Sequence, residues 1–293
     1  MRARRWGVGA KPRPGAFSLM PIATPKAAAK AEFPWWLVAA LVLAAAAAVA
    51  IFTSELYSQV FAIVAKGVGI TVLVTVVSFA AAAAIGLGIA LMALSGSAWL
   101  RQTARLYVEI IRGIPILVLL FWIAFAGVPA FVAGWNFVTA PLQQAGIAGE
   151  LQVRDVPLLW RAVLALMIGY SPFIAEVFRA GIQSVGAGQI EAAKALGLSR
   201  YRRFRHIVMP QAIRTILPPL GNDFIALVKD SSLVSVLGVA DITQMGKIYA
   251  AGSFRFFETY SIVAYIYLIL TVGLSIALRA LERRMRQRGG GSG

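Results

Sequence analysis

The chain contains no cysteine and only one histidine, His206, among its 293 residues. Disulfide bonds and thiolate metal sites are therefore excluded. Charge is scarce as well, because 14% of the residues are charged while 59% are hydrophobic, and the mean hydropathy is +0.78. Such a chain cannot hide its apolar surface in one soluble core. This composition favours a polytopic helical membrane protein.

Acidic residues are the scarcer charged type, since 12 Asp and Glu stand against 28 Lys and Arg, for a formal net charge of +16. In a soluble protein this excess would suggest nucleic-acid binding. Here the basic residues gather in particular segments between apolar runs, a distribution typical of the positive-inside rule for membrane proteins. We therefore expect basic cytoplasmic segments and no nucleic-acid partner.

Apolar runs long enough to cross a bilayer predict an all-α membrane protein with about six transmembrane helices. Trp35-Trp36 would anchor the first span at the membrane interface. Small residues spaced by four in the second span, Ala82, Gly86 and Ala90, would let a neighbouring helix approach closely. The predicted spans are Pro34–Thr53, Val68–Leu94, Arg112–Val128, Arg161–Ala180, Leu217–Val239 and Tyr260–Leu278.

Prolines and glycines predict irregularities in two of these spans. Pro129 and Gly134 would mark a break after the third span, and Ala140–Pro157 would form an external loop or a short interfacial helix. Gly169 and Pro172, inside the fourth span, predict a kink or a local loss of hydrogen bonding.

The distribution of Lys and Arg predicts that both ends of the chain lie in the cytoplasm. Residues 1–33 hold seven Lys and Arg and read as a basic, disordered tail. Residues 34–58 would form an extra N-terminal transmembrane helix, and residues 59–284 the main transmembrane domain. Residues 285–293 would be a basic tail ending in Gly-Gly-Gly-Ser-Gly, which resembles an artificial linker.

One charged, helix-prone segment, Glu191–Pro210, lies between the predicted fourth and fifth spans. Its layout predicts a short helix, a bend permitted by glycine and a second helix. The predicted topology places this segment in the cytoplasm, where it would offer a surface to another protein. The positions that define the segment are Glu191, Ala192, Ala193, Gly197, Ile207 and Pro210.

The spacing E-A-A-x3-G-x9-I-x-L-P resembles the signature of permease subunits of bacterial ABC importers. Met209 stands where leucine is usual, a swap that conserves apolar volume. The resemblance extends from about Ala62 to Arg284 and is strongest to the polar amino-acid (histidine/glutamine/arginine-type) branch. Most of that branch has threonine where this chain has Ile114, a difference that would alter ligand preference if the side chain touches substrate. The segments that carry this likeness are Val108–Trp122, Ala175–Ile182 and Leu217–Thr243.

The resemblance implies a five-helix permease core in a multi-pass protein of the bacterial inner membrane. It implies that the chain forms the translocation path for polar or charged amino acids in an ATP-driven importer. Residues from about 188 to 212 would then hold a coupling helix that docks on an ATPase. Small alanines and Gly197 suit close packing there, and Glu191 offers a charge near a helix N-terminus.

The chain has no G-x-x-x-x-G-K-[ST] phosphate loop. We therefore expect no catalysis and no cofactor in this chain, with ATP and Mg bound by a separate ATPase. The resemblance further implies a second permease subunit, identical or homologous, two cytoplasmic ATPase subunits, and a periplasmic or extracellular amino-acid-binding protein.

Ionisable residues inside the predicted spans are costly in lipid and are functional candidates. Glu176 would either pair with Arg179 at i,i+3 or face the cationic group of a substrate. Lys229 and Asp230 are adjacent on one helix and cannot face each other, so each needs another partner. The predicted substrate-path residues are Arg112, Glu176, Asn222, Asp223, Lys229, Asp230 and Ser231.

Three alternatives to these assignments remain. Glu109 and Arg112 could simply form an i,i+3 ion pair, and the polar residues of Leu217–Val239 could pair inside the helix bundle. An ion-gradient-driven secondary transporter is the alternative function. It predicts internal inverted repeats, of which we find no convincing example, and it leaves the Glu191–Pro210 spacing unexplained.

Overall fold

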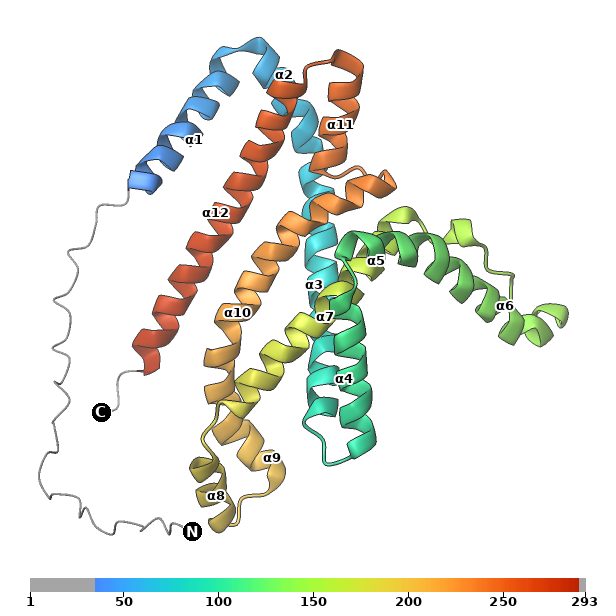
Figure 1. Ribbon diagram of the computed structural model, residues 1–293, viewed down its shortest axis with the longest axis vertical. Helices are drawn as coiled ribbons and strands as arrows, with labels where there is room; N and C mark the ends of the chain where they lie inside the picture. The colour runs from blue at the N-terminus through green and yellow to red at the C-terminus, as the bar shows by residue number, and fades with distance from the viewer. Residues whose placement is uncertain (1–34, 290–293) are drawn as a thin grey trace, which may run out of the picture. The chain divides into compact units, whose positions relative to one another are not determined.

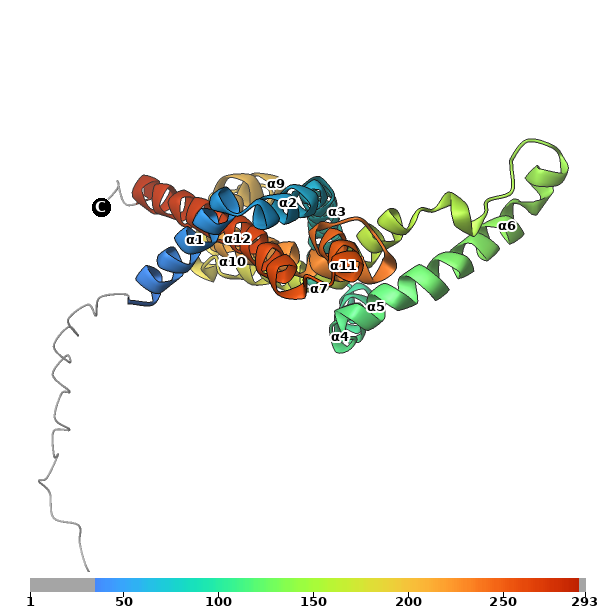
Figure 2. The same cartoon turned by 90° about the horizontal axis from the view of Figure 1, so that it is seen from above.

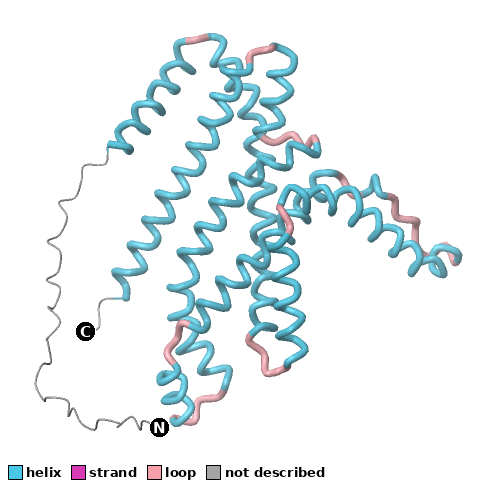
Figure 3. The backbone as a smooth tube through the Cα atoms, in the orientation of Figure 1, coloured by secondary structure: helices cyan, strands magenta, loops and turns pink. Residues whose placement is uncertain are grey.

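The computed structural model describes residues 35–289, and within this range every regular element is a helix (Figures 1 and 3). The predicted all-α class is thereby confirmed. The basic tail predicted for residues 1–33 and residues 290–293 of the predicted C-terminal tail lie outside the described residues, whereas residues 285–289 continue the last helix. By its contacts the chain divides into two compact units, Met1–Leu43 and Ala44–Gly293, and the sites described below lie in the second unit.

Short helices of other types interrupt or join the α-helices of the described range. Two π-helical turns span Ile123–Gly127 and Phe204–Val208, and 3₁₀ turns span Ala65–Gly67, Val153–Asp155 and Ser231–Leu237. The α-helices are α1 (Trp35–Thr53), α2 (Glu55–Val64), α3 (Val68–Ala93), α4 (Ala98–Gly113), α5 (Ile116–Trp122), α6 (Val128–Gln144), α7 (Leu158–Gln183), α8 (Ala187–Ala195), α9 (Arg200–Arg203), α10 (Met209–Asp230), α11 (Ile242–Ser253) and α12 (Phe256–Gly289).

Among the described residues, four helical stretches are long and apolar enough to cross a membrane: Glu55–Ala93, Ile116–Gln144, Leu158–Gln183 and Phe256–Met285. They contain the predicted fourth and sixth spans, all of the second except Leu94, and most of the third. The described apolar part of α1, Val42–Thr53, is shorter. The count of six spans and the cytoplasmic placement of both ends therefore remain predictions.

The predicted boundaries of the third span, Arg112–Val128, are wrong at both ends. α4 ends at Gly113, and the backbone is extended at Ile114 because the ring of Pro115 disfavours a helical residue before it. At the other end the predicted break is absent. Pro129 sits in the first turn of α6, where its missing N–H is tolerated, and a π turn precedes it. Helix therefore continues to Gln144, well into the predicted external loop.

Close packing of α3 against α7 forms the centre of the second unit, as predicted from the small residues of the second span. A β-carbon added at Gly86 would lie 2.9 Å from the main-chain oxygen of Ser171 and 3.0 Å from the nitrogen of Ala175. Ala82 and Ala90 are fully buried beside it. Glycine and alanine thus let the two backbones approach, which is how packing stabilises helix pairs in lipid.

α7 stays helical through Pro172, and the hydrogen bond that proline removes is replaced by hydroxyl groups. Without an N–H on Pro172, the carbonyl of Ile168 accepts from the Ser171 hydroxyl at 3.0 Å. The Tyr107 hydroxyl of α4 then donates to the Ser171 oxygen at 2.7 Å and lies 3.5 Å from the same carbonyl oxygen. The predicted local loss of main-chain bonding therefore exists, and it fastens α4 to α7.

Figures 1 and 2 show where the remaining elements lie within the second unit. α10 runs beside α7, and α8 and α9 form a compact projection where α7 ends and α10 begins. α5, the first π turn and α6 lead away from α3 and α7, and residues 145–157 return to the start of α7.

Candidate functional site

The coupling segment, Glu191–Pro210, folds as the predicted helix, bend and second helix. α8 ends in a Schellman motif: the N–H of Leu198 donates to the Ala193 carbonyl at 3.1 Å, and the N–H of Gly197 donates to Lys194 at 3.0 Å. This motif needs a left-handed residue at Gly197, whose φ is +74°. The three-residue interval between Ala193 and Gly197 in the sequence is therefore fixed by the position at which α8 ends.

Most side chains of the coupling segment are exposed. Glu191 and Ala192 face solvent, whereas Ala193 is only 2% exposed. Leu196 and Tyr201 are large apolar side chains that are 81% and 70% exposed. Exposed apolar side chains rimmed by charge are typical of a protein-binding surface.

The end of the coupling segment is joined directly to α10. Pro210 occupies the first turn of α10, after the π turn Phe204–Val208. The side-chain amide of Gln211 donates to the Ile207 carbonyl at 2.9 Å and also to the Gln189 side chain of α8. A displacement of α8 would therefore be transmitted to the start of α10.

A cavity of about 350 Å³, here called the acidic pocket, lies between the α4–α5 junction, α7 and α10. The charged residues in its wall are Asp223 and Asp230, and no Lys or Arg of the described residues lines it. The Tyr170 hydroxyl donates to Asp230 at 2.7 Å, while the buried Oδ2 of Asp223 has no hydrogen-bond partner within residues 35–289. The apolar part of the wall is formed by Ile111, Ile114, Ile116, Leu119, Gly169, Phe173 and Ala226.

The backbone changes beside the acidic pocket, because α10 gives way to a 3₁₀ turn after Asp230. An interrupted helix next to a polar cavity is a recurring feature of transport sites in membranes. Pro218 and Pro219, by contrast, lie inside α10 and do not end it.

Three predicted path residues on this segment lie outside the acidic pocket. Asn222 and Lys229 are exposed on α10 and line no described cavity, so their contact with substrate stays a prediction. Ser231 is fully buried, and its hydroxyl bonds the Val228 carbonyl at 2.7 Å. Because this bond occupies the hydroxyl in the helix turn, the structure favours a structural role for Ser231.

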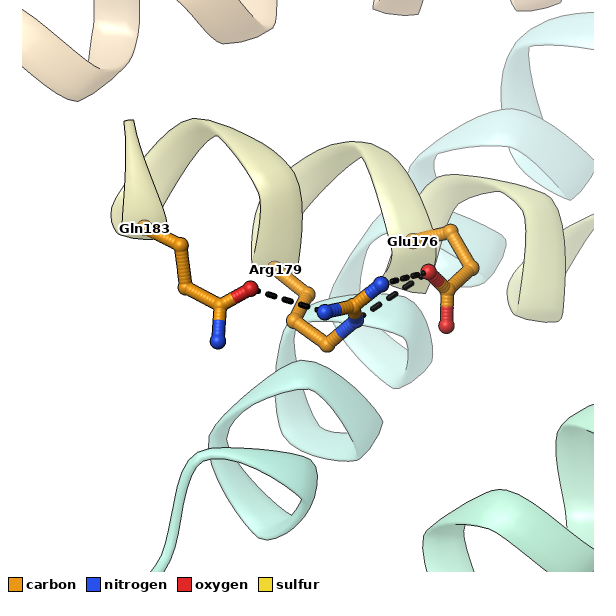
Figure 4. A network of polar contacts seen from close by, with 3 residues as sticks. All are labelled: Glu176, Arg179 and Gln183. Carbon is orange, nitrogen blue, oxygen red and sulfur yellow. Dashed lines mark hydrogen bonds and ion pairs between the residues drawn. The ribbon is translucent and has the colours of Figure 1, made fainter. Parts of the chain in front are cut away.

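A second cavity, here called the α4–α7 cavity, has a volume of about 440 Å³ and polar walls. Glu176 and Arg112, both predicted path residues, line it. Arg179 forms an ion pair with Glu176 at 2.6 Å and bonds Gln183 at 2.7 Å (Figure 4). The i,i+3 pairing considered for Glu176 is therefore present. The ionisable residues in the wall are Arg101, Arg105, Glu109, Arg112, Glu176 and Arg179.

The ion pair considered for Glu109 and Arg112 is wrong. Ion pairs in the described part of the chain join Arg179 to Glu176 and Arg255 to Glu258. The guanidinium carbon of Arg112 instead lies 5.1 Å from the centre of the Phe173 ring. A cation–π contact with α7 has replaced the pair that spacing along α4 allowed.

A buried acid missed by the sequence reading is Asp241. Asp241 is fully buried and caps α11 by accepting from the N–H groups of Thr243 and Gln244. The Tyr267 hydroxyl donates to it at 3.1 Å. Burial raises the pKa of the Asp241 carboxyl, and these hydrogen bonds oppose the rise. The Asp-x-x-Gln spacing before an apolar run was the signal that could have found this cap.

Arg161 was read only as the start of a span, although its buried side chain bonds three main-chain carbonyls. Nε donates to Val156 at 2.8 Å, Nη1 to Ala124 at 3.0 Å, and Nη2 to Val153. These bonds tie the returning loop and the first π turn to α7.

Comparison with known proteins adds independent information. Residues 82–287 match the family model described as binding-protein-dependent transport system inner membrane component. The glutamine transport system permease protein GlnP of Escherichia coli (strain K12) is 39% identical over 199 residues, covering 68% of this chain and 82% of that protein. The probable amino-acid permease protein YxeN of Bacillus subtilis (strain 168) is 36% identical over 197 residues, covering 67% and 80%.

Solved structures match the fold. The crystal structure of an amino acid ABC transporter with histidines aligns with a TM-score of 0.64 and 36% identity, covering 80% of this chain and 98% of that one. An inward-facing structure of the MetNI methionine ABC transporter aligns with a TM-score of 0.58 at 22% identity, covering 76% of this chain and 96% of that one. At 22% identity, the match to the MetNI structure supports only a shared fold.

Proposed function

The chain belongs to the family of binding-protein-dependent transport system inner membrane components, and from this premise we propose that its acidic pocket receives the cationic group of a transported amino acid. As a member, it is a multi-pass permease subunit of an ATP-driven importer in the cell membrane. Membership also disfavours the ion-gradient-driven alternative.

The observation that carries the substrate assignment is the unbalanced charge of the acidic pocket. Asp223 and Asp230 share a largely apolar wall that contributes no cation. Two carboxylates in such a place are costly unless a positive group meets them. The α-ammonium group of the amino acid supplies one positive charge and a basic side chain supplies a second, so a cationic amino acid can match both carboxylates. Tyr170 would hold Asp230 ready for one of these groups. We therefore expect preference for cationic over neutral amino acids, and exclusion of acidic ones.

The coupling proposal concerns the opposite end of α10. We propose that the coupling segment docks on a separate ATPase, which binds ATP and Mg²⁺, through Glu191 and the exposed Leu196 and Tyr201. The bond of Gln211 to Gln189 links α8 to α10, whose 22 residues span about 33 Å. The same helix carries Asp223 and Asp230, so movement of the docked segment would displace both carboxylates.

The assembly we propose contains a second permease subunit, two cytoplasmic ATPases and an external amino-acid-binding protein. ATP binding would bring the two ATPases together and favour one orientation of α10. Hydrolysis would favour the other orientation. Each ligand shifts the equilibrium only by its differential affinity for the two states, which is alternating access in energetic terms.

A binding experiment on the purified permease–ATPase complex without the external protein tests the substrate assignment. Affinities for arginine, histidine, glutamine and glutamate would be measured by equilibrium dialysis. Arginine should bind tightest, and Asp223→Asn or Asp230→Asn should reduce this preference. Glu150→Gln, in an exposed loop, serves as the matched control. Glutamate binding as tightly as arginine, without change in either variant, would refute the assignment.

A further inference from the structure

The acidic pocket and the α4–α7 cavity occupy successive turns between the same two helices. On α4, Ile111 lines the acidic pocket and Arg112 lines the α4–α7 cavity. On α7, Phe173 lines the first and Glu176, one turn further, lines the second. The Arg112 guanidinium over the Phe173 ring, at 5.1 Å, therefore lies at the boundary between the two cavities.

The α4–α7 cavity differs from the acidic pocket in carrying both signs of charge. Four arginines and two glutamates line it. Several are already engaged: Arg179 bonds Glu176 and Gln183, and Arg101 bonds the Ser95 and Gly96 carbonyls at 3.0 and 2.8 Å. Arg105 and Glu109 make no hydrogen bond or ion pair with any other described residue.

Arg105 and Glu109 are spaced i,i+4 and so lie one turn apart on the same face of α4. A guanidinium binds a carboxylate, and a carboxylate binds an ammonium group. Together they match the two charges of a zwitterion. The cavity volume of about 440 Å³ lies within the range of small-molecule sites, roughly 300 to 1,000 Å³. Glu109 and Glu176 oppose an anion such as a phosphate, because they bring negative charge to the same walls.

We infer that the α4–α7 cavity is a second station for the transported amino acid, separated from the acidic pocket by the Arg112–Phe173 contact. The inference rests on the proposed function, because it takes the acidic pocket as the first station. Arg105 holds the α-carboxylate and Glu109 the α-ammonium group at the second station. Gln183, the last residue of α7, lines this cavity, so the second station lies toward the coupling segment.

The contact between Arg112 and Phe173 is suited to act as a partition. A cation–π contact is weak enough to open with a helix movement, since its loss changes an equilibrium by roughly twofold to thirtyfold. While it is formed, the aromatic ring and the guanidinium separate the two stations. Displacement of α10 or α7 by the docked ATPase would then set the order in which the stations are filled.

Binding stoichiometry in the intact permease–ATPase complex tests the second station. With radiolabelled arginine, two sites per permease chain are expected. Glu109→Gln and Arg105→Gln should each remove one site, and Asp230→Asn should remove the other. Glu150→Gln and Arg279→Gln change exposed residues outside both cavities and should retain two sites.

The outcomes separate this inference from the proposed function. One site per chain, unchanged by Glu109→Gln and lost in Asp230→Asn, overturns the second station and leaves the proposed function intact. A wild-type complex that binds no amino acid overturns both. Inorganic phosphate displacing arginine from the second station as effectively as unlabelled arginine would identify an anion site instead, and would also overturn the inference.

Exchange across the membrane tests the partition. In proteoliposomes without ATP, Phe173→Leu and Arg112→Met should raise arginine exchange about threefold or more above the wild-type rate, because each removes the cation–π contact while keeping an apolar side chain. Phe137→Leu, whose wild-type ring is 84% exposed on α6, is the matched control. Exchange at the wild-type rate in both variants, with two sites still bound, would overturn the partition.

Discussion

The coupling segment and the acidic pocket use unpaired carboxylates in opposite ways. Glu191 is exposed on α8, where water solvates its charge until a partner arrives. One oxygen of Asp223 is buried beside a mostly apolar wall and has no hydrogen-bond partner. An exposed carboxylate suits protein association and tolerates being alone, whereas a buried one requires a positive ligand. The difference separates a docking function on α8 from a binding function on α10.

We expect changes in the coupling segment to abolish coupling to the ATPase and to leave amino-acid binding unchanged. Glu191→Lys reverses the exposed charge, and Gly197→Val forces a β-branched residue to a φ of +74°, which costs at least about 1 to 2 kcal/mol locally. Amino-acid-stimulated ATP hydrolysis should be lost in proteoliposomes, while arginine affinity stays at the wild-type value.

Gly149→Val is the matched control for Gly197→Val, because an added β-carbon there meets no atom within 4 Å and the backbone φ is not positive. It should retain stimulated hydrolysis. Normal coupling in Glu191→Lys and Gly197→Val would contradict the docking proposal.

Asp230→Asn should produce the reverse pattern, with weaker binding and intact docking. Removing the charge takes away a charge-assisted interaction worth about 1.5 to 3 kcal/mol, so arginine affinity should fall roughly tenfold to a hundredfold. The ATPase should still co-purify in the wild-type ratio. Loss of the ATPase from this variant would show that the two regions are not separable.

We expect the contact between α7 and α10 to link the acidic pocket to the coupling segment. A change at this contact should therefore affect amino-acid binding and coupling to the ATPase together. A β-carbon at Gly181 would lie 2.1 Å from Cγ1 of Ile216. Gly181→Ala should therefore destabilise the protein by about 1 to 3 kcal/mol through overpacking, seen as a lower Tm in detergent. Adding Ile216→Ala, which removes the Cγ1 atom that the new β-carbon would meet, should restore part of the loss, and a double variant no more stable than Gly181→Ala would argue against this contact.

The smallest effect is expected from Tyr170→Phe, which removes one hydroxyl from the acidic pocket. The hydroxyl donates to Asp230 at 2.7 Å, and one such bond is worth about 0.5 to 1.5 kcal/mol. Arginine affinity should fall about threefold, because the hydroxyl no longer holds Asp230 in place. Tyr201→Phe, in the exposed coupling segment, should leave affinity unchanged. An equal change of arginine affinity in Tyr170→Phe and Tyr201→Phe would show that the acidic pocket and the coupling segment do not differ in their effect on binding.

Local patterns in the sequence predicted those parts of the molecule that local forces determine. The helix–bend–helix of the coupling segment follows from Gly197, because a Schellman motif needs only neighbouring residues. The close approach of α3 and α7 follows from Gly86 and its alanine neighbours. The two carboxylates of the acidic pocket were named because charge inside an apolar run is costly.

Features decided by distant neighbours were not predictable in the same way. Spacing allowed Glu109 and Arg112 to pair, but spacing on one helix does not reveal the Phe173 ring that α7 places beside Arg112. Pro129 was taken as a break, because the sequence gives no sign of the π turn that accommodates it. The separation of the polar path residues into two cavities likewise depends on how α4 packs against α7.

The hydrogen bonds of Arg161 affect how freely the sequence of the loop at residues 145–157 can vary. All three acceptors are main-chain carbonyls, of Ala124, Val153 and Val156. These bonds fix the course of the main chain and do not depend on which side chains the acceptor residues carry. The side chains of residues 145–157 can therefore change by mutation while the hydrogen bonds of Arg161 to the main chain are kept. If this loop faces the external binding protein, as the predicted topology places it, its surface could adapt to a new docking partner while the membrane core stays unchanged.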